Sequence, residues 1–384
     1  MKKLFIASFF LWTFSSLFGQ WTQIGPNIFQ FTLNTRIAVD ANGVPYVAFR
    51  EIVSASTKVM KFDGTNWVVV GQANIGSGTV GGISLAFDNA NTPYIAFFDA
   101  SSSVVDVKKF DGTNWVNVGP SGFVSAISVS LAFEGATPYL AYSDATSGSL
   151  SVVKFDGTNW VNVGSPGFSS SGTDYVSLAF DGTTPYVAFQ DFGNSQKATV
   201  MSFNGTSWSV VGSAGFSAGA AQFLSLALDG STPYVAFKDS GNGQKATVMS
   251  FNGGSWTTVG TAGFSPGIAE YISLAIRNSV PYVVYTDDNN ADKARVDFFN
   301  GGSWVQLGGY MGTGLTSHTS LVIKADSAYV AYSDGSNVFT AVAQKYVFPP
   351  PTGCNITASG LSNIQCNDNG TPTNPNDDYI TFDL

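Results

Sequence analysis

The ten-residue stretch FDGTNWVNVG (residues 155–164) decides the fold, because close copies of it recur along nearly the whole chain. Its tryptophan has counterparts at intervals of 45 to 48 residues, at Trp21, Trp67, Trp115, Trp208, Trp256 and Trp304. A Pro-Tyr pair keeps the same interval, starting at Pro45, Pro93, Pro138, Pro185, Pro233 and Pro281, and Ala328-Tyr329 takes the seventh place. Self-similarity at such an interval is typical of repeat architectures, so the fold has to be built from one repeat.

One repeat, residues 174–212, contains four short apolar segments separated by turn residues. The first two predicted strands, residues 175–180 and 186–190, are joined by a tight Asp-Gly turn. The next two, residues 197–203 and 208–212, are joined by an Asn-Gly turn. Four antiparallel strands per repeat of about 45 residues are typical of a β-propeller blade. The Trp of each repeat is interpreted as packing of the outer strand, with ligand contact as the alternative.

Counting the repeats predicts a closed ring. Inner strands are predicted near Ile37, Leu85, Leu131, Leu178, Leu226, Leu274 and Leu321. The seventh repeat ends after its third strand, residues 341–348, whereas residues 21–25 form a Trp strand with no repeat before it. We therefore expect the N-terminal strand to complete the last blade and remove its open sheet edge. The predicted fold is an all-β, seven-bladed propeller of four-stranded antiparallel blades.

The two ends of the chain do not follow the repeat. Residues 1–19 have a basic start, an apolar run and small residues, which predicts a signal peptide that is too short to span a bilayer. The propeller is predicted over residues 20–348, a Pro-rich linker over 349–353, and an incomplete β-rich second domain over 354–384. The only cysteines, Cys354 and Cys366, are expected to form a disulfide in an exported protein.

Charge excludes two classes of partner. The net charge is −9 and only 11% of residues are charged. Nucleic-acid binding needs a basic surface, and none is visible in the sequence. Insertion into a membrane is not expected either. We expect a monomeric propeller within a longer chain.

A carboxylate follows every second strand of the repeat. These residues are Glu51, Asp99, Asp144, Asp191, Asp239, Asp287 and Asp334. A ring of seven acids could hold a cation or bind sugar hydroxyls. The structural alternative is that each acid accepts hydrogen bonds from the backbone of its own loop.

A second column lies three residues before each inner-strand Leu or Ile, and it varies while its surroundings do not. It contains Asn34, Gly82, Ser128, Tyr175, Phe223, Tyr271 and His318. We expect it at the mouth of the central channel, on the face with the longer and more variable loops, where function usually lies. Its aromatic members suit the apolar face of a sugar. The alternative is that these residues only plug the channel.

Catalysis has little support in the sequence. His318 is the only histidine, which excludes multi-histidine metal sites, and no nucleophile elbow or zinc motif is present. A glycosidase needs two carboxylates in different environments, and the acids of the ring are equivalent. No cofactor is expected, although calcium could bind near residues 287–290 or at Asp377-Asp378.

Two stretches resemble known families. Residues 37–47 (IAVDANGVPYV) resemble the NHL-type inner strand of secreted β-propellers. Residues 366–371 (CNDNGT) and 377–380 (DDYI) resemble the start of Ig-like modules in cell-surface adhesins of type IX-secreting Bacteroidetes. The resemblance implies export to the cell surface and binding of glycan or a protein partner. The alternatives are a secreted polysaccharide hydrolase or lyase, and a spacer without a ligand.

Overall fold

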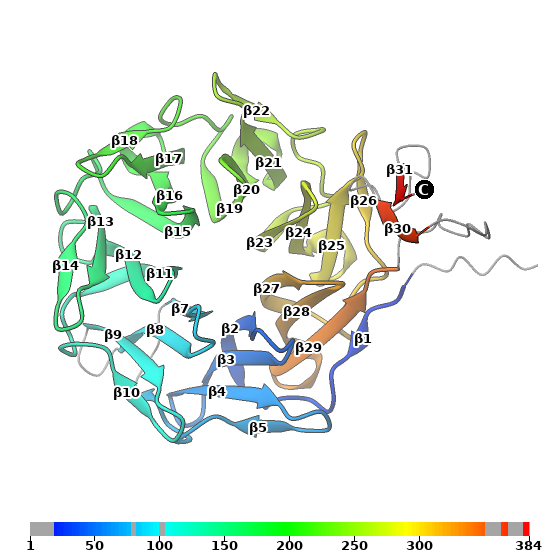
Figure 1. The fold of residues 1–384 in the computed structure, drawn as a ribbon, viewed down its shortest axis with the longest axis horizontal. Helices are drawn as coiled ribbons and strands as arrows, with labels where there is room; N and C mark the ends of the chain where they lie inside the picture. The colour runs from blue at the N-terminus through cyan, green and yellow to red at the C-terminus, as the bar shows by residue number, and fades with distance from the viewer. Residues whose placement is uncertain (1–18, 78–81, 100–103, 350–361, 368–378, 384) are drawn as a thin grey trace, which may run out of the picture.

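Seven antiparallel sheets surround a central axis in the computed structural model, as the repeat count predicts (Figure 1). The structure describes residues 19–77, 82–99, 104–349, 362–367 and 379–383. Within each blade the strands follow one another outwards from the axis, so the first strand of every repeat is the inner one. The predicted all-β, seven-bladed propeller is therefore confirmed.

The blades are built from the following strands. Blade 1 contains β2 (Thr32–Val39), β3 (Pro45–Glu51), β4 (Ser56–Phe62), β5 (Trp67–Val69) and the short β6 (Gly76–Ser77). Blade 2 contains β7 (Ile83–Phe87), β8 (Pro93–Asp99), β9 (Val104–Phe110) and β10 (Trp115–Asn117). Blade 3 contains β11 (Ala126–Glu134), β12 (Thr137–Asp144), β13 (Leu150–Phe155) and β14 (Trp160–Asn162). Blade 4 contains β15 (Thr173–Asp181), β16 (Thr184–Asp191), β17 (Lys197–Phe203) and β18 (Trp208–Val210).

The remaining blades repeat this plan. Blade 5 contains β19 (Ala221–Asp229), β20 (Thr232–Asp239), β21 (Lys245–Phe251) and β22 (Trp256–Thr258). Blade 6 contains β23 (Ala269–Arg277), β24 (Val280–Asp287), β25 (Lys293–Phe299) and β26 (Trp304–Gln306). Blade 7 contains β27 (Thr316–Lys324), β28 (Ser327–Asp334), β29 (Thr340–Val347) and, as its outer strand, β1 (Thr22–Gln23).

The N-terminal strand closes the ring, as expected. β1 pairs antiparallel with β29, with Thr22 opposite Lys345. The backbone N–H groups of Ile24 and Ile28 continue this contact by donating to the carbonyls of Ala343 and Ala341. Residues more than 300 positions apart in the sequence thus share one sheet, and β1 covers part of the outer edge of β29.

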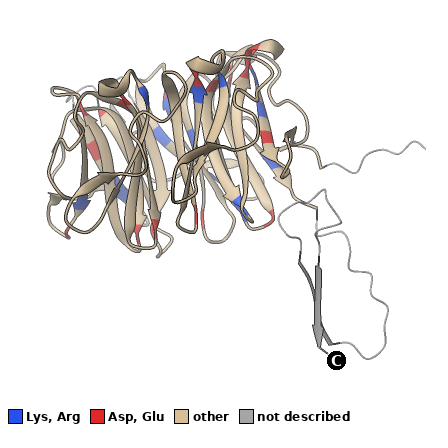
Figure 2. Ribbon diagram, turned by 90° about the horizontal axis from the view of Figure 1, so that it is seen from above, with Lys and Arg blue, Asp and Glu red and all other residues tan. Residues whose placement is uncertain are grey.

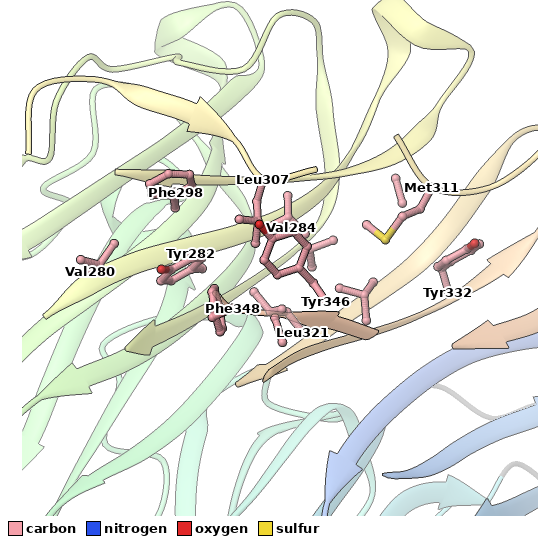
Figure 3. Close-up of a cluster of buried hydrophobic side chains, with 14 of the residues drawn as sticks. Val280, Tyr282, Val284, Phe298, Leu307, Met311, Leu321, Tyr332, Tyr346 and Phe348 are labelled. Atoms are coloured by element: carbon pink, nitrogen blue, oxygen red, sulfur yellow. The ribbon is translucent and has the colours of Figure 1, made fainter. Parts of the chain in front are cut away.

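The hydrophobic core lies between the blades rather than in one centre. Seven clusters of buried side chains are present, one at each interface between neighbouring blades. Figure 3 shows the cluster between blades 6 and 7, where Tyr282 and Val284 face Leu321 and Tyr346. Burial of each such side chain contributes about 1.5–3 kcal/mol. Because each sheet is covered on both faces, the strands are nearly continuous apolar runs.

The repeated tryptophan is structural, because it links each blade to the one before it. In blade 4 the Trp208 indole Nε1–H donates to the Val163 carbonyl of blade 3 at 2.7 Å. All seven tryptophans make this bond, at 2.7 to 2.9 Å, to Leu307, Ile24, Val70, Val118, Val163, Val211 and Val259. On four of them a Phe from the preceding blade-to-blade loop stacks with ring planes 8° to 12° apart; these are Phe123, Phe168, Phe216 and Phe264.

The connections after the second strands differ from the irregular loops that the sequence predicts. In blades 4 to 7 they contain a single turn of 3₁₀ helix, namely η1 (Phe192–Asn194), η2 (Ser240–Asn242), η3 (Asp288–Asn290) and η4 (Gly335–Asn337). The carboxylate of the preceding strand caps each turn, as Asp191 does by accepting from the Gly193 N–H.

The C-terminal part is described only in two short strands. β30 (Ser362–Asn367) pairs antiparallel with β31 (Tyr379–Asp383). Cys354 and residues 350–353 lie outside the described residues, and so do residues 1–18. The predicted disulfide, linker and signal peptide therefore stay predictions.

Candidate functional site

A β-bulge marks the inner strand of six blades near its N-terminal end, and in five of them it contains the residue of the variable column. The register of β15 against β16, for example, slips between Asp174 and Ser177; the corresponding slips lie in β2, β11, β19, β23 and β27. At five of these bulges the column residue has a positive φ of 49° to 54°, in Asn34, Tyr175, Phe223, Tyr271 and His318. A left-handed backbone costs a non-glycine residue about 1–2 kcal/mol. Strain of this kind is typical of functional positions.

The whole column lies around one cavity. All seven column residues line a central cavity of about 380 Å³. Six of them belong to the N-terminal halves of the inner strands and Gly82 directly precedes β7. These ends lie on the face that carries the blade-to-blade loops and the 3₁₀ turns, which are visible along one edge of the ring in Figure 2. The structure therefore places the following predicted residues around one cavity: Asn34, Gly82, Ser128, Tyr175, Phe223, Tyr271 and His318.

The cavity has an aromatic half and a small, polar half. In blades 4 to 7 the four rings touch in sequence: Tyr175 and Phe223 have centroids 5.1 Å apart, Phe223 and Tyr271 5.1 Å, and Tyr271 and His318 4.6 Å. We call these four residues the aromatic arc. Asn34, Gly82 and Ser128 take the same positions in blades 1 to 3. Because these side chains are short, space remains in front of the arc, and the residues do not fill the channel completely.

Burial sets the protonation of the groups in this cavity. Desolvation, together with the charge of Arg36, lowers the pKa of His318 to about 4. The imidazole is therefore neutral near pH 7, with Nδ1 3.0 Å from the Ser317 hydroxyl. Burial also raises the pKa of Asp174, whose carboxylate accepts from the Tyr175 N–H at 2.7 Å.

Serine hydroxyls connect the inner strands just below the column. The Ser177 Oγ accepts from the backbone N–H of Leu226 in the next blade at 3.0 Å. Equivalent bonds of 2.9 to 3.2 Å are made by Ser84, Ser130, Ser225, Ser273 and Ser320. These bonds satisfy N–H groups on the inner sheet edges, which other strands do not cover.

The carboxylates after the second strands are not part of the cavity lining. Asp191 accepts from the Gly193 N–H, Asn194 Nδ2 and Thr199 Oγ1 at 2.8 to 3.0 Å. Asp239, Asp287 and Asp334 also accept within and next to their own loops, and the Ser147 N–H lowers the pKa of Asp144. Glu51 forms an ion pair with Lys58 at 2.6 Å. Asp99 ends its strand at the same place. The backbone bonds of five acids agree with the structural interpretation; these are Asp144, Asp191, Asp239, Asp287 and Asp334.

The described residues also bear on metal and membrane binding. In this part of the chain no group of three or more His, Cys, Asp or Glu side chains is arranged to hold a metal ion. At the first calcium candidate, Asp287 accepts from Gly267 N–H and Tyr310 O–H, and Asp288 from Ile268 N–H. The second candidate, Asp377-Asp378, lies outside the described residues. No helix among the described residues is long and apolar enough to cross a membrane.

Two charged lining residues, Asp174 and Arg36, were not predicted from the sequence. Asp174 stands one position before Tyr175, and Arg36 stands where the other blades have the linking serine. Arg36 could have been found by aligning the repeats, because it is the single exception to a serine column. Asp174 could not, because its column has no constant residue type.

Comparison with known proteins identifies the architecture. No protein-family model matches the chain, and no curated protein sequence matches it. The chain is similar to a protein of unknown function from Dyadobacter fermentans, at 12% identity over 85% of this chain and 98% of that chain, with a TM-score of 0.51. It is similar to the Aleuria aurantia lectin in complex with alpha-methyl-L-fucoside, at 17% identity over 75% and 98%, with a TM-score of 0.51.

A polysaccharide lyase has a similar fold as well. This ulvan lyase, bound to a saccharide of glucuronic acid and rhamnose sulfate, is 12% identical over 83% of this chain and 95% of that chain, with a TM-score of 0.56. At such low identities these similarities show a shared propeller fold.

Proposed function

We propose that this protein binds glycan through the central cavity on the loop-rich face of the propeller. The observation that carries the proposal is the aromatic arc, four touching rings that form one wall of a cavity of about 380 Å³. Flat apolar walls combined with a few placed polar groups are typical of small-ligand sites. The strained backbone under five column residues supports a role beyond filling space.

Propeller neighbours support glycan as the ligand class. One similar structure is a fucose-binding lectin and another is a polysaccharide lyase. Binding is favoured over catalysis because Asp174 is the only carboxylate among the described lining residues, whereas glycoside hydrolysis usually uses two. A protein partner, an enzyme and a spacer without a ligand are separate outcomes of the test.

The rest of the proposal concerns where the protein acts. We propose that residues 1–19 direct export, so that the protein is secreted or held at the cell surface. On this view residues 349–353 link the propeller to an Ig-like module that begins at residue 354, with Cys354 and Cys366 bonded to each other. The resemblance to adhesins of type IX-secreting Bacteroidetes supports this arrangement.

The test is a glycan array with residues 20–384, followed by calorimetry of the hits. Tyr175→Asn and Tyr271→Asn should weaken binding about 10-fold or more, because each removes one ring of the wall. Asn is the right replacement, since Asn34 adopts the same backbone conformation in blade 1, at φ 54°. Phe192→Asn, an exposed aromatic outside the cavity, is the matched control.

Each outcome points to a different function. Binding that the two tyrosine variants do not alter contradicts the cavity as the site. Turnover of a polysaccharide that depends on Asp174 overturns the proposal in favour of an enzyme. No saccharide bound anywhere on the array contradicts glycan as the ligand class.

A further inference from the structure

The six serines that link neighbouring inner strands form what we call the serine ring. Arg36 in blade 1 stands at the one position of this ring that has no serine. The residue before the inner-strand Leu or Ile is serine in the other six blades, and each serine accepts an N–H from the next inner strand. A guanidinium has five N–H donors and no acceptor atom. Arg36 therefore cannot make this bond to blade 2, and its presence has to be explained by something other than ring closure.

The charge of Arg36 has no counterion in the described structure. Its Nη1 donates to the adjacent Thr35 carbonyl at 2.9 Å, and no carboxylate of the described residues forms an ion pair with it. Within the propeller, the two segments outside the described residues, 78–81 and 100–103, contain no Asp or Glu. A half-buried cation without a partner is costly, and burial lowers the pKa of Arg36 without neutralising it.

The surroundings of Arg36 leave its charge available to a ligand. His318 lies near enough for the two charges to interact, but it is neutral at physiological pH. Asp174 comes from blade 4, on the far side of the ring. It precedes Leu178 by four positions, whereas Arg36 precedes Ile37 by one, so Asp174 lies nearer the mouth. Glu270 near the mouth is held by Lys238 at 2.9 Å.

We propose that Arg36 is an anion receptor at the floor of the cavity, which selects saccharides that carry a carboxylate or sulfate group. This inference rests on the proposed glycan function and names the chemical class of the ligand. A guanidinium can bind either anion through two parallel N–H···O bonds. The sugar ring that carries the anion then lies against the aromatic arc, because Arg36 and the arc line the same cavity.

The size of the cavity decides which part of a saccharide can enter. A volume of about 380 Å³ lies near the lower end of ligand pockets, which span roughly 300–1,000 Å³. A short acidic saccharide, or the end of a longer chain, fits this volume. The two possible anions are a uronate carboxylate and a sulfate ester, and a guanidinium recognises both in the same way. Probes that carry only one of the two anions distinguish between them.

The experiment compares ligands that differ only in charge. Short oligogalacturonate is titrated into residues 20–384 beside its methyl ester, which has the same skeleton without the charge. A sulfated carrageenan oligosaccharide is compared with its desulfated form in the same way. The protein should bind one charged probe about 10- to 100-fold more tightly than its neutral partner, which is the usual effect of a hydrogen-bonded charge, and added salt should weaken this preference.

The variant Arg36→Ser isolates the receptor. It restores the residue found in the other six blades, so the propeller is expected to fold, and it should bind charged and neutral probes equally. Arg36→Gln is a second variant of similar length that removes the charge. Lys109→Ser is the control, because it removes the same charge from an exposed side chain outside the cavity and should keep the preference.

The outcomes separate this inference from the proposed function. Saccharide binding without a preference for charge, or a preference that survives in Arg36→Ser, overturns the receptor and leaves glycan binding intact. If neither charged nor neutral saccharides bind, both proposals fail. A preference for carboxylate alone or for sulfate alone supports the receptor and identifies the source of the anion.

Discussion

The outer rim and the inner rim of this propeller are built from the same repeats, but they differ in regularity. On the outer rim seven tryptophans make the same hydrogen bond to the preceding blade. On the inner rim the column residue differs in most blades, although its backbone is alike in five of them. A position that is identical in every blade serves the contacts that every blade shares. A position that varies can serve one ligand placed off the axis.

The largest expected effect is on the outer rim. Trp208→Ala removes a buried ring and the bond to the Val163 carbonyl, so the free energy of unfolding should fall by about 3–5 kcal/mol. Trp208→Phe keeps most of the apolar ring and should cost less, about 1–3 kcal/mol, mainly from the unpaired carbonyl. Urea unfolding of both variants measures the difference. A loss below about 1 kcal/mol for Trp208→Ala would contradict the structural role of this rim.

The next effect concerns the buried histidine of the inner rim. The pKa of His318 falls from 6.5 to about 4 on folding, so the unfolded chain binds more protons between these two values. Stability is therefore complete above about pH 6.5 and is lost as the pH falls to about 4, by about 3 kcal/mol.

The variant His318→Asn removes this titration while keeping a residue that tolerates the positive φ of 54°. Between about pH 7 and pH 4 the unmodified protein should lose about 3 kcal/mol more stability than the variant. Urea unfolding across this range is the measurement, and parallel pH profiles would show that His318 is protonated in the folded cavity. Carboxylates titrate alike in both proteins, so they cancel in the comparison.

The smallest expected effect on stability concerns the linking serines of the inner rim. Ser177→Ala removes the acceptor for the Leu226 N–H and should lower the free energy of unfolding by about 1 kcal/mol. Arg36→Ser should raise it by a similar amount, because it introduces the same acceptor into the one blade that lacks it. Equal stability of all three proteins would show that the serine ring contributes nothing to closure.

The repeat made the fold predictable to the level of single strands. The Trp strand at residues 21–25 was assigned to the last blade from counting alone, and β1 pairs with β29 as expected. The candidate site was predictable only as a column, because Tyr175, Phe223, Tyr271 and His318 are 47 to 48 residues apart in sequence. Their ring contacts and the size of the cavity depend on the bulges, which period-two alternation does not predict. The acids after the second strands are just as regular in the sequence, but they do not form a site in the structure. In blades 4 to 7 their carboxylates cap the 3₁₀ turns that follow.

The number of blades, the order of the strands and the way the ring closes could all be predicted from the repeats in the sequence. These follow from interactions that every repeat carries in the same form, so one repeat reports on all seven. Three features became evident only in the folded ring: four rings form one wall, short side chains leave space in front of it, and Arg36 lines the same cavity. Such features depend on residues of different blades meeting across the axis, and the distances between them exist only once the ring has closed.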